Sequence, residues 1–258
     1  MLDVDAYLRR IHYDGDVTPS KETLRDLHRA HMLTVPFENL DIHARRPLTL
    51  DETGLFHKIV DRRRGGFCYE LNGLFAMLLR ALGFRVTLLG AQVVLGEDLA
   101  TLAVGSGPFT DHLTLLVDLD ERWLADVGFG NSFVEPLPLD AGGEEVQGST
   151  AYRLRPHAGR WLLLRRDGGD AWQPQYLFTT EPRTLADFAA DCWAKQQSPF
   201  WNERPRCSLA TPDGRVTVTA DRLIVTAGGE RHEQELHDHA SYVAALLRHC
   251  GVDLAQDA

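Results

Sequence analysis

The sequence has few cysteines and no long hydrophobic run. Its four cysteines, Cys68, Cys192, Cys207 and Cys250, lie far apart and form no Cys-x-x-Cys pair. This spacing argues against a structural zinc site or a disulfide scaffold and is typical of a protein in the reducing cytoplasm. No stretch approaches the roughly 18 apolar residues that a membrane-spanning helix needs. The N-terminus has no basic segment followed by an apolar run, so we expect no signal peptide.

The chain is also short of positive charge. It carries 27 Lys and Arg against 37 Asp and Glu, which gives a formal net charge of −10. A negative surface disfavours nucleic acid and anionic membranes as partners, because both attract basic side chains. With 258 residues, 44% of them hydrophobic, the chain can form one large domain or two to three small ones around a buried core.

The first third of the chain has the apolar spacing of helices. Apolar residues at positions 4, 7, 8 and 11 predict one helix, capped by Asp3 and stopped by Gly15. Thr18-Pro19 predicts the start of a second helix, with proline at its first position. The segment Thr49–Glu52 has the spacing of a capping box and predicts a third helix.

The later part of the chain changes to the periodicity of strands. A helix near residues 184–196, two strands at 215–219 and 222–226, and a helix near 239–248 capped by Asp238 are expected after the central region. The helices-first order predicts an α+β fold. Six short β-rich segments in the centre fit small antiparallel sheets or a barrel: 86–95, 112–119, 122–127, 152–155, 161–166 and 175–178.

Cys68 is the strongest candidate for a chemical role. It follows Arg-Gly-Gly-Phe and begins a strongly amphipathic helix that ends at Gly83. The positive end of a helix favours a thiolate and can hold an oxyanion, and the paired glycines allow another backbone to approach. The alternative is that Cys68 is a small buried apolar residue.

A nucleophilic cysteine needs a base, and the base needs an orienting group. Most of the eleven histidines fit other roles. Three near the C-terminus, His237, His239 and His249, suggest a metal only weakly, because their neighbours complete no known ligand spacing, and we expect no metal. Five others lie in surface-type helix patterns and are expected to be solvated: His12, His28, His31, His43 and His57.

His112 differs from the other histidines because it opens an apolar strand after the glycine-rich loop 105–109. Asp126 closes the next strand, and the turn between them is expected at Asp118–Glu121. If the two strands form a hairpin, both side chains lie at its open end and can meet. A carboxylate that ends a buried strand needs such a partner, although pairing depends on a register that sequence does not determine.

These motifs together resemble the arylamine N-acetyltransferase family. The stretch around Cys68, the His112 strand, the segment Asp126–Gly130 and the earlier Val35–Leu40 occur in the family's order over most of residues 1–135. The resemblance implies three domains. They are a helical domain (1–84), an antiparallel β-barrel (85–182) and a small α/β lid (183–258), and the match is weak beyond residue 135.

The resemblance also implies which residues act. The family's Cys-His-Asp triad falls on Cys68, His112 and Asp126, and the activity would be ping-pong transfer of acetyl from acetyl-CoA to an arylamine or hydrazine. Apolar walls for the flat acceptor ring are implied at three positions: Phe37, Val93 and Phe129.

Contacts to coenzyme A are expected at three residues. Thr110, Gly128 and Gly130 are candidates for the phosphates or pantetheine of coenzyme A, although a glycine turn is more often only a turn. The C-terminal segment 253–258, where the family's contacts vary most, is short here. Asp111 either raises the pKa of the adjacent histidine or faces solvent.

Glu38 and Arg64 fit two interpretations, a structural ion pair beside the triad or separate surface charges. Two functional alternatives also stay open: a cysteine hydrolase or transglutaminase-like amidase, and a non-catalytic module. A monomer or homodimer is expected.

Overall fold

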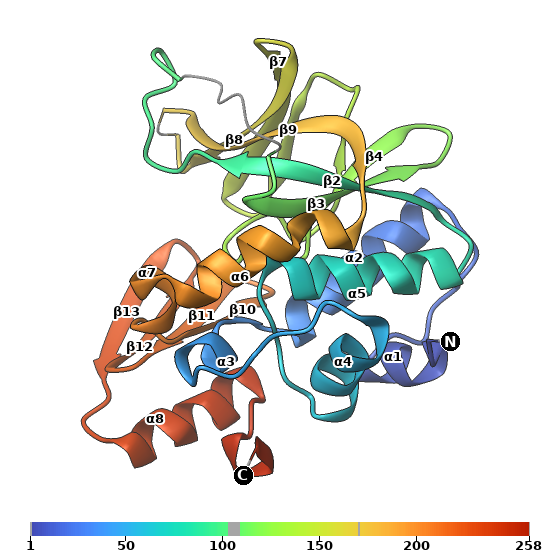
Figure 1. Ribbon diagram of the computed structural model, residues 1–258. Coiled ribbons are helices and arrows are strands. Elements are labelled where there is room, and N and C mark those ends of the chain that lie inside the picture. The colour runs from blue at the N-terminus through green and yellow to red at the C-terminus, as the bar shows by residue number, and fades with distance from the viewer. Residues whose placement is uncertain (1, 103–108, 170, 258) are drawn as a thin grey trace.

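The computed structural model describes residues 2–102, 109–169 and 171–257, and its first part is helical as predicted (Figure 1). Asp3 caps the first helix by accepting from the amide of Ala6. That helix ends at Arg10, before the predicted stop at Gly15, because His12 adopts a positive φ of 55° that a helix cannot continue. The helices are α1 (Val4–Arg10), α2 (Lys21–Thr34), α3 (Leu40–His43), α4 (Glu52–Phe56) and α5 (Cys68–Ala81).

Two predicted helix starts are wrong in detail. The second helix was expected to begin at Thr18-Pro19. Instead, Ser20 caps α2 by accepting from the amide of Thr23, so Pro19 lies outside the helix. Asp51, rather than Thr49, caps α4. Short polar side chains compete at such positions, and the one that reaches a free amide decides where the helix begins. A π-helical turn at 57–61 follows α4.

The central part forms an antiparallel sheet in the order β5-β4-β3-β2-β9-β8-β7-β6, which curves into a nearly closed barrel. Leucine and aromatic side chains from seven of these strands, all except β6, fill its interior. Strands β5 and β6 had no sequence signal because they are short and β6 is largely polar. The strands are β2 (Arg85–Val93), β3 (His112–Asp118), β4 (Arg122–Ala125), β5 (Leu137–Pro138), β6 (Glu144–Gln147), β7 (Thr150–His157), β8 (Arg160–Asp167) and β9 (Gln173–Arg183).

Four strands from the last part of the chain and the short β1 from its first part form a second antiparallel sheet, in the order β1-β10-β11-β12-β13. Asp238 caps α8 as predicted. Strand β13 was not predicted, because all its side chains are exposed and polar. The elements are β1 (Phe37–Glu38), α6 (Ala189–Gln197), α7 (Pro199–Asn202), β10 (Arg206–Thr211), β11 (Gly214–Thr219), β12 (Arg222–Ala227), β13 (Glu230–Glu235) and α8 (His239–Ala245), with a 3-10 turn at Leu185–Phe188, a π-helical turn at Leu246–Cys250 and a terminal 3-10 turn at Leu254–Asp257.

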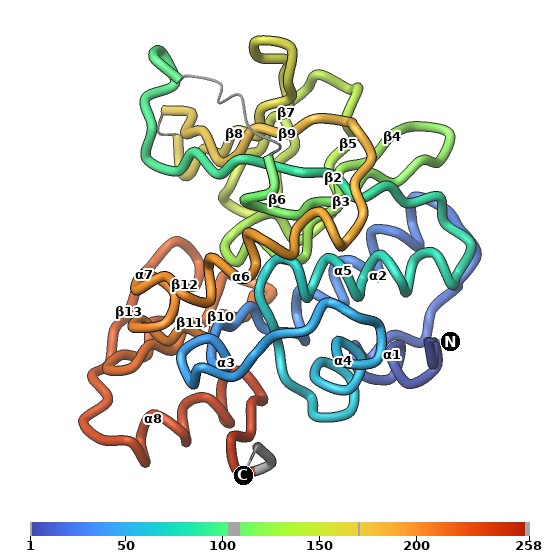
Figure 2. Tube along the Cα trace, viewed as in Figure 1, coloured from blue at the N-terminus to red at the C-terminus, as the bar shows by residue number. Residues whose placement is uncertain are grey.

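Helix α5 lies at the centre of the molecule. It runs beneath β2 and β3 of the barrel, and both termini of the chain lie on the side away from the barrel (Figure 2). Eleven of its 14 residues are buried, including the first nine. The helix is covered because its apolar residues pack against α1, α4 and the barrel at once. Its N-terminal end therefore lies inside the protein. No helix within the described residues is long and apolar enough to cross a membrane.

Candidate active site

Cys68 is the first residue of α5, and its side chain is 6% exposed. The carboxylate of Glu70 accepts from the amide of Phe67 at 3.0 Å, which caps the helix immediately before the thiol. A Cβ on Gly65 would lie 2.0 Å from the carbonyl oxygen of Pro36. The predicted close approach of another backbone therefore occurs, and only glycine allows it.

His112 and Asp126 meet at the open end of a hairpin, as predicted. The β3–β4 register pairs Leu115 with Ala125 and Asp118 with Arg122. This register brings Nε2 of His112 to 2.7 Å from Oδ2 of Asp126, and both side chains are almost completely buried.

The buried pair is an ion pair. Burial alone lowers the pKa of His112, but the charge and hydrogen bond of Asp126, together with a hydrogen bond to Cys68, raise it to about 10. Burial likewise favours the neutral form of Asp126, yet His112 and two further donors leave its pKa below the usual value. Because Nε2 of His112 bonds the carboxylate of Asp126, the other ring nitrogen, Nδ1, is left to form the hydrogen bond with the Cys68 thiol. The thiol therefore contacts an imidazolium at neutral pH.

Asn72 holds the carboxylate from α5 and was missed in the sequence. Its Nδ2 donates to Oδ1 of Asp126 at 2.8 Å and to the carbonyl oxygen of Leu113 at 2.6 Å, and its Oδ1 accepts from the amide of Val127 at 2.9 Å. A signal was available. Asn72 lies four residues after Cys68, one helical turn along the same face, and is a polar residue within the apolar stretch of the helix.

Two predictions about histidines are wrong. His28 and His31 are fully buried, not solvated. His28 lies four residues after Leu24 and His31 four residues after Leu27, so both belong to the apolar face of α2. Nδ1 of His31 bonds the hydroxyl of Tyr7, and Nε2 of His28 accepts from the amide of Asp126 at 3.1 Å. His43 and His57 are exposed as predicted.

The predicted acceptor-ring residues lie next to the histidine–aspartate pair. The ring centroid of Phe129 is 5.0 Å from that of His112 and 4.9 Å from that of Tyr176, a residue that the sequence did not suggest. Phe37 packs against Gly130, so it lies beside the same turn. Val93 lies two residues beyond the partner of His112 in β2 and shares its face. All three predicted wall residues, Phe37, Val93 and Phe129, are half-buried.

The residues predicted to contact coenzyme A have other partners as well. The hydroxyl of Thr110 donates to the carboxylate of Asp191. A Cβ on Gly128 would lie 2.8 Å from Cα of Cys68, so this glycine allows the Asp126 turn to pack on the helix start. Gly130 has a φ of +83°, which favours glycine. Their role toward coenzyme A stays a prediction.

Asp111 neither simply faces solvent nor bonds His112. One carboxylate oxygen pairs with Lys195 of α6 at 2.5 Å, and the other accepts from the amide of Val93 at 3.0 Å. Burial raises the pKa of Asp111, but Lys195 and the amide outweigh it, and the pKa lies below its usual value. Residues 105–108 of the glycine-rich loop lie outside the described residues.

Glu38 and Arg64 form a buried ion pair, which excludes the surface alternative. Nε of Arg64 donates to Oε1 of Glu38 at 3.0 Å, and the side chains are 1% and 0% exposed. Asp41 lies 3.3 Å from a second nitrogen of Arg64. The pair ties β1 to the segment that leads into Cys68.

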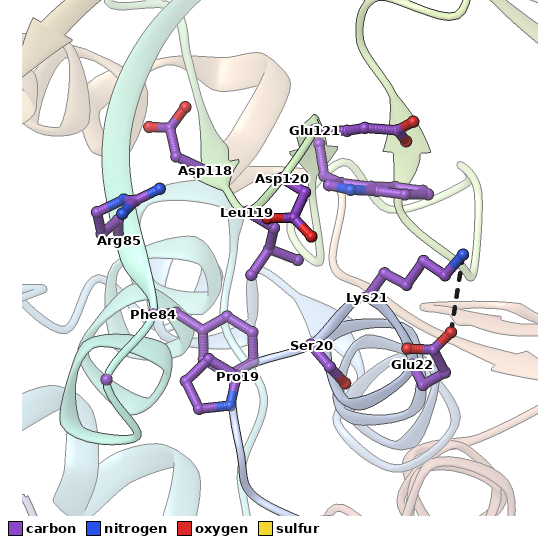
Figure 3. A pocket seen from close by; sticks show the side chains of 12 residues that line it. Pro19, Ser20, Lys21, Glu22, Phe84, Arg85, Asp118, Leu119, Asp120 and Glu121 are labelled. Carbon is purple, nitrogen blue, oxygen red and sulfur yellow. Dashed lines mark ion pairs between the residues drawn. The ribbon is translucent and has the colours of Figure 1, made fainter.

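A surface hollow of about 550 Å³ lies elsewhere (Figure 3). Its walls include Lys21 and Glu22 at the start of α2, Arg85, and the turn Asp118–Glu121. It is at the opposite end of β3 from His112, and its walls include none of Cys68, His112 and Asp126. Nowhere in the described part of the chain do three or more His, Cys, Asp or Glu side chains form a group able to hold a metal ion.

Comparison with known proteins agrees with this geometry. The N-acetyltransferase family model matches residues 20–258. The arylamine N-acetyltransferase of Mycolicibacterium smegmatis is 36% identical over 261 residues, 98% of this chain and 93% of that protein. The structure of Mycobacterium marinum arylamine N-acetyltransferase in complex with CoA is 32% identical, with a TM-score of 0.90 over 99% of this chain and 95% of that one.

A more distant relative is described with a glutamate as the third residue of its triad. The arylamine N-acetyltransferase NAT3 of Bacillus cereus, described as having a unique Cys-His-Glu catalytic triad, is 27% identical, with a TM-score of 0.86 over 98% of this chain and 100% of that one. In the present chain, the carboxylate that bonds the histidine belongs to Asp126. Sequence, fold and site therefore agree, and the chain belongs to the arylamine N-acetyltransferase family.

Proposed function

We propose that this protein transfers an acetyl group from acetyl-CoA to an arylamine or hydrazine by a ping-pong mechanism, with Cys68, His112 and Asp126 as the catalytic triad. The observation that carries the proposal is the buried ion pair of His112 and Asp126, 2.7 Å apart, in hydrogen-bond contact with a cysteine that begins a helix. In this arrangement a charged imidazolium stabilises a thiolate, and the helix start provides free amides.

In the first half-reaction the Cys68 thiolate attacks the carbonyl carbon of the acetyl thioester. The new carbon–sulfur bond forms at Cys68, and amides at the start of α5 lie where the oxyanion develops. The bond to the sulfur of coenzyme A then breaks, and His112 gives its proton to the departing thiolate. The product is an acetyl-cysteine and free coenzyme A.

In the second half-reaction the amine nitrogen attacks the acetyl-cysteine. His112, now neutral, takes the proton of the amine while the bond to Sγ of Cys68 breaks, and the imidazolium–thiolate pair is restored. Asp126 keeps Nε2 of His112 protonated throughout, so Nδ1 is the nitrogen that exchanges the proton with sulfur and substrate.

The acceptor ring would lie between Phe37, Val93 and Phe129. These side chains are half-buried, and they lie beside His112 and the turn that follows Asp126, so they offer apolar surface next to the proposed triad. Aromatic walls favour a flat ring through offset or edge contacts. Thr110, Gly128 and Gly130 are the proposed contacts for coenzyme A.

The division of labour among the three domains follows from this mechanism. Residues 1–84 carry the nucleophile, residues 85–182 carry the base and its carboxylate, and residues 183–258 form the lid. Lys195 and Asp191 of α6 bond residues next to His112, which supports a covering role for this last part.

Mass spectrometry of the intact protein tests the mechanism. After incubation with acetyl-CoA alone, the chain should gain one acetyl group, located on Cys68 by peptide mapping, and should lose it on addition of aniline or phenylhydrazine. Cys68→Ser is the matched control and should gain none. An amidase would instead be acetylated by acetanilide and would release the acetyl group to water without an amine. No acetylation of Cys68 by acetyl-CoA would refute the proposal.

A further inference from the structure

We infer that His28 is a positioning residue of the triad, which holds the backbone of Asp126 through a neutral imidazole. The inference rests on the proposed catalytic role of Asp126. It starts from an unusual contact. Nε2 of His28, on α2, accepts a hydrogen bond from the backbone amide of Asp126, 98 positions later in the chain, at 3.1 Å.

This contact is one of three by which successive backbone amides at the Asp126 turn donate to side chains. Asp126 follows the last residue of β4, so its amide extends beyond the strand pairing. The amides of Asp126, Val127 and Gly128 bond side chains instead: Nε2 of His28, Oδ1 of Asn72 at 2.9 Å, and Oδ1 of Asp126 at 3.0 Å. A buried amide without a partner is costly. The turn that presents the carboxylate is therefore held by side chains from α2 and α5.

The hydrogen bonds determine the tautomer of His28. Nε2 accepts from the Asp126 amide and so carries no proton, which places the proton on Nδ1. Nδ1 then donates to the carbonyl oxygen of Val134 at 2.9 Å. The ring stacks on Phe133 at an interplanar angle of 18° and meets Phe75 edge-on. The two hydrogen bonds on opposite sides of the imidazole and the two aromatic contacts together fix its orientation.

A charged His28 would not fit this arrangement, because its Nε2–H would face the N–H of Asp126. Burial lowers the pKa of His28 to about 4, although the Val134 carbonyl and Asp126 act in the opposite direction. The titratable groups that face the ring are Asp126 from the turn and His31 from α2 itself; burial likewise keeps the pKa of His31 well below its usual value. Geometry and charge thus agree on a neutral ring.

The contact with His28 controls where the Asp126 carboxylate lies. Its Oδ2 must remain 2.7 Å from His112, and an error on the order of 1 Å in such a contact can reduce catalysis about a hundredfold. Without the bond to His28, the Asp126 amide would seek another acceptor and move the start of the turn. His28 touches neither substrate nor reacting atom, so it acts through Asp126.

Two substitutions separate the two bonds of the ring. In His28→Gln the side-chain oxygen can occupy the place of Nε2 and still accept from the Asp126 amide. In His28→Asn the side-chain nitrogen can occupy the place of Nδ1 and still donate to Val134, while the bond to Asp126 is lost. We expect His28→Asn to reduce kcat for acetyl transfer at least about tenfold, and His28→Gln to stay within about threefold. KM for the amine should change little in either variant.

His31→Leu is the matched control, since it alters the other buried histidine of the same helix face without touching Asp126. It should lower stability while leaving kcat unchanged. If His28→Asn and His28→Gln lose kcat equally, or only in proportion to their loss of stability as His31→Leu does, His28 has a merely structural role.

Nitrogen NMR of the full chain gives a readout that does not depend on turnover. The wild-type His28 should show a protonated Nδ1 and a bare Nε2 from pH 8 to pH 5, whereas His112 should be protonated on both nitrogens. His28→Asn, but not His28→Gln, should shift the Asp126 amide resonance and lower the pKa of His112. A protonated Nε2 on His28, or an unmoved Asp126 amide in His28→Asn, overturns the inference even if Cys68 is acetylated. Failure of Cys68 to be acetylated refutes the proposed function and leaves these resonances to decide the contact.

Discussion

Replacing Asp126 by Asn reverses the donor and acceptor that His112 meets, and the structure dictates the direction. Oδ1 of Asp126 accepts from Nδ2 of Asn72 at 2.8 Å and from the amide of Gly128 at 3.0 Å. An asparagine must therefore place its oxygen at this position, where two donors meet it. Its NH₂ group then faces Nε2 of His112, which has to accept.

The cost follows from the charge of the imidazole. With Nε2 accepting, the proton of His112 lies on Nδ1 and faces Cys68, so the ring cannot take the thiol proton. Burial persists without its compensating carboxylate, so the pKa of His112 should fall from about 10 to below 6.5. A change of more than three pKa units corresponds to about 5 kcal/mol of lost preference for the imidazolium. We expect acylation of Cys68 to slow by about 10² to 10⁴-fold at pH 7.

The free energy of unfolding should also depend on pH differently in the two proteins. In the wild type, the stability contributed by the charged His112 is present below pH 6.5 and is lost as the pH rises through about 10. In Asp126→Asn this loss at high pH should disappear, since the ring is already neutral at pH 7. Urea unfolding at pH 7 and pH 10.5 measures the difference between the two proteins.

Single-turnover stopped flow with a chromogenic acetyl ester measures acylation directly. Asp140→Asn is the matched control, because Asp140 is an exposed carboxylate paired with Arg122, and its loss should leave the rate unchanged. Circular dichroism verifies that both variants are folded. A folded Asp126→Asn protein that acylates within about threefold of the wild type would refute the triad and the orientation argued for the amide.

Four further predictions concern neighbouring groups. Iodoacetamide should modify Cys68, which contacts an imidazolium, before the other three cysteines, two of which have thiol pKa values raised by burial; peptide mapping that finds another labelled first, with parallel loss of activity, contradicts the nucleophile. Phe129→Ala should slow the amine half-reaction by about 1 kcal/mol, more for arylamines than for small hydrazines, and spare the burst of coenzyme A; an unchanged acceptor preference makes it a packing residue. Glu38→Gln should lower the free energy of unfolding by about 3 kcal/mol, because Arg64 loses its closest carboxylate at full burial; an unchanged urea midpoint contradicts this. Neutral His28 contributes stability above pH 6.5 that is lost as the pH falls to about 4, at about 1.4 kcal/mol per unit; an equal slope in His28→Gln would contradict it.

Local patterns in the sequence were sufficient for much of the secondary structure. The amphipathic helix after the paired glycines, the two strands that carry His112 and Asp126, and the caps Asp3 and Asp238 all depend on neighbours a few residues away, and all were predicted. The errors at Pro19 and Thr49 also have a local cause. Several polar side chains could cap each helix, and only the folded structure decides which one reaches a free amide.

The sequence by itself also determined the chemical candidates. A cysteine after two glycines at a helix start, a histidine that opens an apolar strand and an aspartate that closes the next one have few structural reasons to occur together. Their spacing defines a possible triad, and its resemblance to a family narrowed the chemistry further. What it left undetermined was the strand register on which their meeting depends.

Only the tertiary structure decided what surrounds the triad. His28 and Asn72 come from two different helices, and both reach the turn at Asp126. Helical spacing identifies the buried face of α2, but it cannot say which distant backbone amide a histidine on that face will meet. The ionisation of His112 was equally beyond the sequence, because it results from burial opposed mainly by the Asp126 carboxylate at 2.7 Å and also by Cys68. Such contacts join residues far apart in the chain, so they exist only once the helices have packed on the barrel.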